Sequence, residues 1–368
     1  MDRSQSPTSP RLQRRHALRC ALALLTATWL PRMAFAQASD SPASEADIAS
    51  APSYADSPRV PQLAARLAQQ TELDRKWIVS QLGRARFQPE VVRLIIPGKP
   101  QQKNWAVYRS HFVNAMRIRA GSDFIQEFSV WLRKAENRFG VPPAIVTGIL
   151  GVETIYGRTM GNFRVLDALA TLSLDFPTTA PTDRSDYFSA QLGDYLLWCH
   201  QNDFDAAEVK GSYAGAIGMP QFMPGNILRY ALNFDGGSKI DIIDNPADAI
   251  GSVGNFLAGH GWQRDEPTHF PLVVPHSIEP GTLERLLEPD IIPSFSARQL
   301  QAEGLPLPPH ALDYAGKLSV VQLPNADGEP DYILGTDNFY VVTRYNHSAL
   351  YALAVIELGN AALAASQT

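Results

Sequence analysis

The fold is decided around one stretch, residues 141–157, which reads VPPAIVTGILGVETIYG. Its two prolines favour the start of a helix, because the first turn of a helix has amide donors without partners and tolerates proline. Ile145, Ile149 and Glu153 follow at intervals of four residues, so one helix face carries two large apolar side chains and then a carboxyl group. The pattern predicts a buried helix that places a carboxyl in an apolar neighbourhood.

Glu153 is the candidate catalytic residue of this helix. Removal from water favours the neutral form of a carboxyl and raises its pKa, which lets a glutamic acid act as a general acid near neutral pH. Gly148, Gly151 and Gly157 each cost about 1 kcal/mol against alanine inside a helix, so they predict close approach of another segment. The spacing alone leaves open the alternative that Glu153 only caps or pairs a buried helix end.

Residues 1–36 have the pattern of an export signal. Basic residues precede an apolar run from Cys20 to Leu30, and small residues suited to cleavage end at Ala36. The run is about half of the roughly 20 residues that a bilayer span needs, so no membrane span is expected. We expect a periplasmic protein, exported by the Sec route in preference to the twin-arginine route that Arg14-Arg15 resembles.

Charge and cysteine content exclude several classes of protein. The chain of 368 residues has a formal net charge of −5, and loss of the basic signal makes it more acidic. Nucleic acids and anionic membrane surfaces are therefore poor partners. Only Cys199 remains after cleavage, so no internal disulfide is possible. We expect Cys199 to be a small buried hydrophobe and not a nucleophile.

The fold class is predicted to be mainly α (α+β). After the signal, composition and periodicity divide the chain into a disordered leader, a helical domain, a helical catalytic core, a small strand-rich insertion, and a return to the core with a C-terminal helix. These parts cover residues 37–57, 58–140, 141–265, 266–335 and 336–368.

Short β-prone runs fill the chain from Glu266 to about Tyr345. The clearest are 270–274, 318–323 and 332–334. Ser296 and Gln299 have the spacing of a capping box ahead of a short helix. Residues 344–348 concentrate polar and aromatic groups at a predicted strand-to-helix junction, followed by an apolar helix at 348–364.

Residues 210–224, KGSYAGAIGMPQFMP, are too rich in glycine and proline for a continuous helix. They predict a loop whose small residues let another chain approach the backbone. The loop lacks the glycine, lysine and hydroxyl spacing of a nucleotide-binding loop.

The sequences GVETIYG at 151–157 and NFRVLDALATL at 162–172 resemble the catalytic motif of the membrane-bound lytic transglycosylase B family. The resemblance extends from about Trp77 to the C-terminus and matches Glu153 to the catalytic glutamate. It implies a lysozyme-like helical core that binds peptidoglycan glycan strands. The implied reaction cleaves the β-1,4 bond between N-acetylmuramic acid and N-acetylglucosamine and forms a 1,6-anhydromuramoyl end, with no cofactor required.

The same resemblance implies a set of groove residues. Those matching Ser212 and Gln221 face the sugar next to the scissile bond, and the alternative left open is that Ser212 is a plain turn former. The remaining matches are aromatic and amide side chains suited to sugar faces and N-acetyl groups, and each aromatic side chain is, taken singly, more often core or rim than ligand. They are Tyr108, Tyr345, Asn346 and Tyr351.

Two positions depart from the family pattern. Phe256 stands where the family commonly has tyrosine, so its ring can stack but a hydroxyl is absent. Arg184 follows Asp183 where relatives can show adjacent arginines suited to an anionic peptide stem. Selectivity for peptide-bearing glycan is therefore expected to differ.

Residues 233–241, NFDGGSKID, stand where the family often has a calcium loop. Calcium prefers several oxygen ligands with carboxylates at alternating positions. The candidates are Asn233, Asp235, the carbonyl of Lys239, and Asp248. This donor set is weak, because Asn233 replaces an aspartate and Gly237 has no side chain, so an ordinary turn with Asx hydrogen bonds is favoured.

Glu153 is the only convincing catalytic carboxylate, whereas ordinary glycosidases use two. Asp167 and Asp175 follow it, but Asp167 is expected to cap or pair within a helix. One acid suffices if the substrate's acetamido group supplies the second function. A muramidase of the same fold that admits water, or a non-catalytic peptidoglycan-binding protein, remains an alternative.

Overall fold

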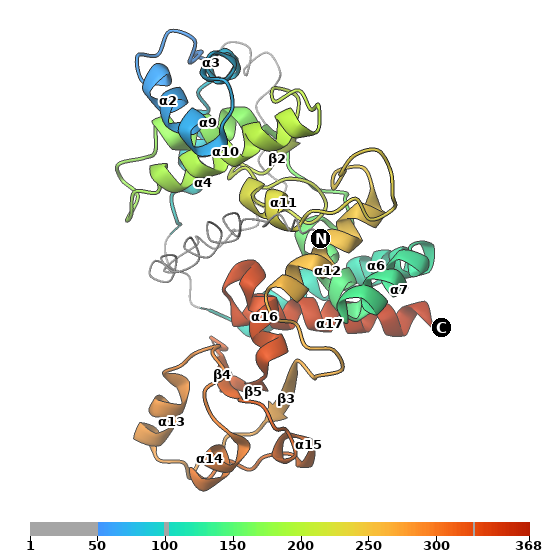
Figure 1. Cartoon of the computed structure of the whole chain (residues 1–368). Helices are drawn as coiled ribbons and strands as arrows, with labels where there is room; N and C mark the ends of the chain where they lie inside the picture. Colours follow the sequence, from blue (N-terminus) through green and yellow to red (C-terminus); the bar gives the residue numbers. More distant parts are fainter. Residues whose placement is uncertain (1–50, 99–102, 327) are drawn as a thin grey trace, which may run out of the picture.

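The computed structural model describes residues 51–98, 103–326 and 328–368. The predicted signal peptide and most of the predicted leader lie outside these residues. Helices dominate, with two small antiparallel sheets (Figure 1).

In the part of the chain that the structure describes, seven helices precede the first strand. They are α2 (Val60–Thr71), α3 (Arg75–Gly83), α4 (Pro89–Ile95), α5 (Trp105–Phe112), α6 (Ala115–Glu127), α7 (Ser129–Phe139) and α8 (Pro143–Thr154). The middle of the chain contains β1 (Phe163–Arg164), α9 (Val165–Leu174), α10 (Ser185–Gln201), β2 (Lys210–Gly211), α11 (Pro224–Tyr230) and α12 (Pro246–Gly259).

The remaining elements are β3 (His269–Leu272), α13 (Pro280–Leu287), α14 (Ala297–Ala302), α15 (Pro309–Leu312), β4 (Ser319–Leu323), β5 (Asp331–Gly335), α16 (Asp337–Asn346) and α17 (Ala349–Ser366). The strands of the insertion are ordered β3-β5-β4, all antiparallel. The predicted strand runs and the Ser296–Gln299 capping box are confirmed.

α8 and α17 pack against each other in the helical core. A Cβ at Gly148 would lie 2.1 Å from the carbonyl oxygen of Val355, and one at Gly359 would lie 1.9 Å from that of Ala144. Two glycines on facing helices therefore let the backbones touch, which confirms the close approach that the glycines of α8 predicted. Gly157 lies beyond the end of α8 with φ of 87°, so its predicted place inside the helix was wrong.

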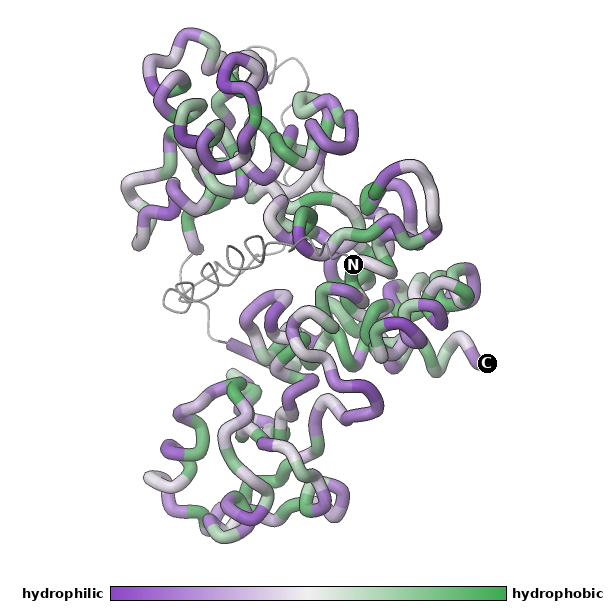
Figure 2. The backbone as a smooth tube through the Cα atoms, in the orientation of Figure 1, coloured by the Kyte–Doolittle hydropathy of each residue, from purple (hydrophilic) through white to green (hydrophobic). Residues whose placement is uncertain are grey.

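One hydrophobic cluster extends from Tyr54 to Ala362, and the insertion contributes a second cluster. α2 packs against α10, and α4 packs against α9. α5 packs against α17, and α6 packs against both α17 and α8. The segment 58–140 therefore contributes to two regions of the core. Hydrophobic residues gather in the interior of each region and hydrophilic residues line the outer turns (Figure 2).

The prediction that residues 344–348 join a strand to a helix was wrong. These residues join two helices, α16 and α17. The sequence of α16 is rich in β-branched and aromatic residues, yet Thr336 caps the helix by accepting from the amide of Phe339, and Phe339 and Val342 are buried. Packing thus overrides the local β propensity.

Among the helices of the described residues, α17 is the one long and apolar enough to cross a membrane by length and composition. Its apolar side chains pack against α8 and α6, and 56% of it is buried inside the protein. The helix is accordingly a core element of this fold.

Candidate active site

Glu153 lies in the last turn of α8. Ile145 and Ile149 on the same face are buried, as their spacing predicted, and the Glu153 side chain is partly exposed. The helix stops because Ile155 and Tyr156 adopt left-handed backbone angles, with φ of 51° and 57°. This conformation is costly for a β-branched residue, so the surrounding packing must impose it.

The carboxyl of Glu153 has one hydrogen-bond partner among the described residues. The hydroxyl of Tyr351, on α17, donates to Oε1 at 2.5 Å. Burial raises the pKa of Glu153 to about 7, and the Tyr351 hydrogen bond lowers it in part. A carboxyl with this pKa exists in both protonation states near neutral pH, which suits a group that first gives and then takes a proton.

The two other carboxyl groups considered, Asp167 and Asp175, are engaged elsewhere. Asp175 accepts from the Tyr54 hydroxyl at 2.6 Å and pairs with Arg59. Asp167 pairs with Arg164, as expected for a structural carboxylate. Within the described residues, neither carboxyl contributes to the pKa of Glu153.

Ser212 follows β2 directly and opens the glycine-rich loop. Its Oγ accepts from the amide of Ala216 at 3.0 Å, and its own amide donates to the Ala216 carbonyl at 2.9 Å. The serine therefore closes a tight turn, as the alternative prediction had it, while its O–H makes no hydrogen bond to the described residues.

The loop is fastened to the end of the glutamate helix by Thr154, a residue that the sequence analysis did not single out. Its hydroxyl donates to the Met219 carbonyl at 2.9 Å and accepts from the Gly157 amide at 3.0 Å. Its place beside Glu153 was visible in the sequence, but nothing local identifies its partner.

Gln221 lies in the same loop with a left-handed backbone, φ 48°. Its side-chain amide donates to the carbonyls of Met160 and Gly218 at 3.1 and 3.0 Å. Tyr345, near the end of α16, donates to the Pro220 carbonyl at 2.8 Å. The structure thus brings Tyr345 against the residue before Gln221, and Tyr345 is near enough to Glu153 for that carboxyl to contribute to its raised pKa.

Tyr351 and Phe256 differ from the prediction of direct sugar contact. Tyr351 is 0% exposed, and its hydroxyl is committed to Glu153. Phe256 is 2% exposed and lies 4.7 Å from Tyr345 and 5.5 Å from Phe222, measured between ring centroids. Both rings are covered by other side chains, so neither presents a face to a ligand in this structure.

Tyr108 and Asn346 lie at the edges of the site. Tyr108, on α5, packs with the rings of Trp105 and Phe112, and its proximity contributes to raising the pKa of Tyr351. Asn346 is the last residue of α16 and lines a cavity of about 250 Å³ together with Ser348. The rest of this cavity is lined by Lys103, by residues 347, 349 and 350, and by Leu287, Asp290, Val320, Gln322 and Pro324 of the insertion.

Arg184 precedes α10, and its guanidinium lies 4.7 Å from the Tyr187 ring centroid and 5.2 Å from that of Phe188. Its Nη1 is buried without a hydrogen-bond partner among the described residues. Burial lowers the pKa of the guanidinium.

In the candidate calcium loop, side-chain oxygens accept hydrogen bonds from backbone amides of the same loop. Asn233 Oδ1 accepts from the Gly236 amide at 2.8 Å and Asp235 Oδ1 accepts from the Gly237 amide at 2.7 Å. The buried Asp248 accepts from the amides of Phe234 and Asp241.

The side chain of Lys239 lies over the ring of Phe204. In the part of the chain that the structure describes, no group of three or more His, Cys, Asp or Glu side chains could hold a metal ion. In this arrangement the side-chain oxygens of Asn233, Asp235 and Asp248 accept from the chain's own amides, which is the hydrogen-bond pattern of Asx turns.

Cys199 is buried and makes no disulfide. Burial raises the pKa of its thiol to about 12. A thiol in this state is not a nucleophile near neutral pH, in agreement with its predicted place in the core.

The chain is similar in sequence to a known protein family and to a curated relative. The transglycosylase SLT domain family matches residues 55–360. The membrane-bound lytic murein transglycosylase B of Escherichia coli (strain K12) is 36% identical over 317 residues, which are 84% of this chain and 83% of the relative.

Three solved structures are similar to this chain over most of its length. The soluble lytic transglycosylase SltB1 of Pseudomonas aeruginosa has a TM-score of 0.76 at 33% identity, covering 84% of this chain and 100% of that chain. The Escherichia coli lytic transglycosylase Slt35 in complex with calcium has a TM-score of 0.74 at 35% identity, covering 86% and 96%. SltB3 of Pseudomonas aeruginosa in complex with NAG-anhNAM-pentapeptide has a TM-score of 0.69 at 27% identity, covering 82% and 78%. With a family match over most of its length and a lysozyme-like helical core, the chain belongs to the lytic murein transglycosylase B family.

Proposed function

We propose that the protein is a peptidoglycan lytic transglycosylase, which cleaves the β-1,4 bond between N-acetylmuramic acid and N-acetylglucosamine and leaves a 1,6-anhydromuramoyl end. The observation that carries this proposal is the single carboxyl of Glu153, partly buried beside Tyr351, with its pKa raised to about 7. Family membership and the anhydro sugar bound to SltB3 support it.

In the proposed first step, neutral Glu153 protonates the glycosidic oxygen and the bond to C1 breaks. The 2-acetamido carbonyl of the substrate supports the positive charge that develops at C1. Since the substrate provides this group, no second protein carboxylate is needed, in contrast to ordinary glycosidases.

In the second step, ionised Glu153 takes the proton of the muramic C6 hydroxyl while that oxygen attacks C1. The acid is thereby restored, and no water is consumed. The Tyr351 hydroxyl, which donates to Oε1, holds the carboxyl in place and stabilises its ionised form between the two steps.

Ser212, Gln221, Tyr345 and Asn346 are proposed to contact the sugar. The free O–H of Ser212 is suited to orient the acetamido group. Tyr108 is proposed to border the groove, and the buried Nη1 of Arg184 is a candidate donor to an anionic peptide stem. The proposed reaction has no step at the Asn233–Asp248 loop, whose oxygens are engaged by the chain itself.

Residues 1–36 are proposed to direct export to the periplasm, where peptidoglycan is accessible. The name of the Escherichia coli relative describes a membrane-bound enzyme. Fractionation of cells that produce the full chain tests this, since a cytoplasmic full-length product would contradict export.

The deciding experiment is mass spectrometry of the muropeptides that the purified protein releases from cell-wall sacculi. Anhydro products, one water lighter than reducing-end products, are expected. Reducing-end products would instead support a muramidase, a name that one similar structure carries beside transglycosylase. Binding to sacculi without release would support a non-catalytic protein.

A further inference from the structure

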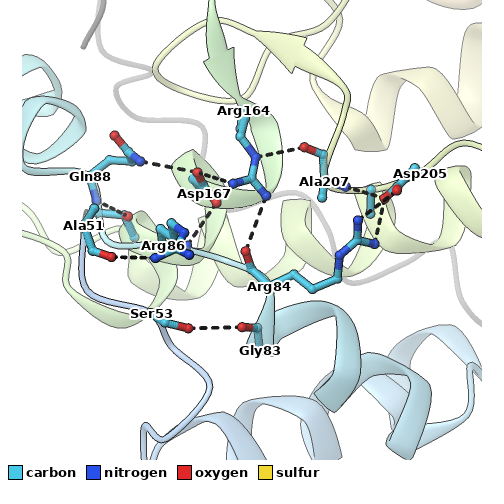
Figure 3. Close-up of polar contacts among 12 residues, drawn as sticks. Ala51, Ser53, Gly83, Arg84, Arg86, Gln88, Arg164, Asp167, Asp205 and Ala207 are labelled. Carbon is cyan, nitrogen blue, oxygen red and sulfur yellow. Dashed lines mark hydrogen bonds and ion pairs between the residues drawn. The ribbon is translucent and has the colours of Figure 1, made fainter. Parts of the chain in front are cut away.

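Arg164 lies in a polar cluster that joins segments distant in the sequence (Figure 3). Its Nε donates to the Ala207 carbonyl at 2.8 Å, and its Nη2 donates to the Arg84 carbonyl at 3.3 Å. Its Nη1 lies 3.4 Å from Oδ2 of Asp167, which is 1% exposed. One planar guanidinium therefore connects the start of α9 with two separate stretches of backbone.

The partners of Arg164 are held in turn. Asp167 accepts from the Arg86 amide at 3.0 Å and from the Gln88 side chain at 3.3 Å. The side chain of Arg84 pairs with Asp205 at 2.7 Å, and Asp205 accepts from the Ala207 amide at 2.9 Å. The backbone around Ala207 is thus held through both its amide and its carbonyl.

This backbone leads directly into the glycine-rich loop. The Val165 amide donates to the Val209 carbonyl at 3.0 Å, and Arg164 pairs with Lys210 in the β1–β2 ladder. Ser212 is the next residue after that ladder. A Cβ on Gly161 would lie 2.2 Å from the Gly211 carbonyl oxygen and 2.7 Å from the Ser212 nitrogen.

We propose that Arg164 is a positioning residue for the reaction, which fixes the 205–212 segment and so sets where the Ser212 loop stands against Glu153. The inference rests on the proposed function of that loop. Arginine is required because its planar fork reaches two carbonyls and a carboxylate at once, whereas the ammonium of lysine is a point charge on a flexible stem.

The test compares Arg164→Lys with Arg66→Lys. Arg66 is a matched control, because it also bridges two helices, through Asp186 and Ser189 at 2.8 Å each, but lies on α2 away from the loop. Hydrogen exchange is followed by mass spectrometry in peptides that cover 205–217, α8 and α17. Turnover of sacculi is measured on the same samples.

In Arg164→Lys, exchange in 205–217 is expected to become about tenfold faster, with α8 and α17 unchanged. The kcat is expected to fall by about tenfold or more with KM nearly constant, since a displacement of about 1 Å at an active site can cost about 10²-fold. Arg66→Lys is expected to leave both kcat and the exchange of 205–217 as in wild type.

Unchanged exchange in 205–217, or faster exchange there with unchanged kcat, would overturn the inference. If Arg164→Lys loosens the whole protein, Asp167→Asn serves as the second variant. It keeps both carbonyl contacts of Arg164, and a smaller rise in exchange confined to 205–217 is expected, while an unchanged profile would again overturn the inference. A wild-type protein that releases no anhydro product would instead count against the proposed function itself.

Discussion

Glu153 at the end of α8 and Asp167 at the start of α9 are both helix-borne carboxyl groups whose pKa is raised by burial, yet their surroundings differ. Asp167 accepts hydrogen bonds from Arg86 and Gln88 and pairs with Arg164 (Figure 3). Glu153 has one partner, Tyr351, and its Oε2 has no hydrogen bond to the described residues.

The difference separates a structural carboxyl from a catalytic one. Burial raises the pKa in both cases, but hydrogen bonds and a cation stabilise the charged form of Asp167 and occupy its oxygens. Glu153 keeps an unoccupied oxygen and a proton near neutral pH. Burial alone therefore does not identify the acid; burial with few partners does.

The largest expected effect is the loss of turnover when the catalytic carboxyl of Glu153 is removed. Glu153→Gln should keep the fold and glycan binding but lose about 10²–10⁴-fold in turnover, because one group performs both proton transfers. Release of anhydro muropeptides from sacculi measures this. Activity within tenfold of wild type would refute the assignment.

The same substitution tests the pKa. The folded-state pKa of Glu153, about 7, is above the ordinary value of 4.5 for a glutamic acid. The folded state therefore favours neutral Glu153, and this stabilisation is complete below pH 4.5 and lost as pH rises through 7. Wild type should lose about 1–3 kcal/mol of unfolding free energy between pH 5 and pH 8 that Glu153→Gln does not lose. Parallel pH profiles of denaturant unfolding would contradict the shift.

Substitution of Asp167 is expected to lower the stability of the protein. Asp167→Ala removes the partner of a largely buried guanidinium and leaves the amide of Arg86 without its acceptor. The free energy of unfolding should fall by about 3 kcal/mol. The midpoint of the pH–activity profile should not move, and a displaced midpoint would show that Asp167 is coupled to the acid.

A smaller effect is expected from Tyr351→Phe, which removes the hydroxyl that donates a hydrogen bond to Glu153. The Tyr351 hydrogen bond lowers the Glu153 pKa, so its removal should raise that pKa and move the alkaline fall of kcat/KM to higher pH. The kcat should drop by about tenfold, the scale of a hydrogen bond to a charged group. Tyr345→Phe is the control, because its hydroxyl donates to Pro220, and an equal shift there would remove the specific role of Tyr351.

The smallest expected effect concerns the carboxylates of the 233–248 loop, which resemble Asp167 in being engaged by amides. Millimolar calcium should leave the melting temperature nearly unchanged, whereas specific binding at 100 times its Kd would add about 2.7 kcal/mol. Differential scanning calorimetry with calcium or chelator decides this. A clear calcium-dependent rise, lost in Asp235→Asn, would show that the loop rearranges to bind the ion.

Much of the fold follows from local patterns. The spacing of Ile145, Ile149 and Glu153 predicted that the carboxyl lies in line with two buried isoleucines, since helical geometry repeats every 3.6 residues, although α8 is buried on all of its faces. Capping at Ser296 and the strands of the insertion were equally readable. The β-rich sequence of α16 was misleading, because its helix depends on packing that no local window contains.

Some features of the site could likewise be predicted from the sequence, and others depend on tertiary contacts. By itself, the sequence determined that a carboxyl ends an apolar helix and that residues 210–224 form a glycine-rich loop, because backbone geometry depends on neighbouring residues. Only the tertiary structure decided that Tyr351, 198 residues away, bonds that carboxyl, that Phe256 is covered, and that Asp167 is satisfied. Desolvation and hydrogen bonding depend on which distant segments pack together, and those contacts determine which carboxyl keeps a usable proton.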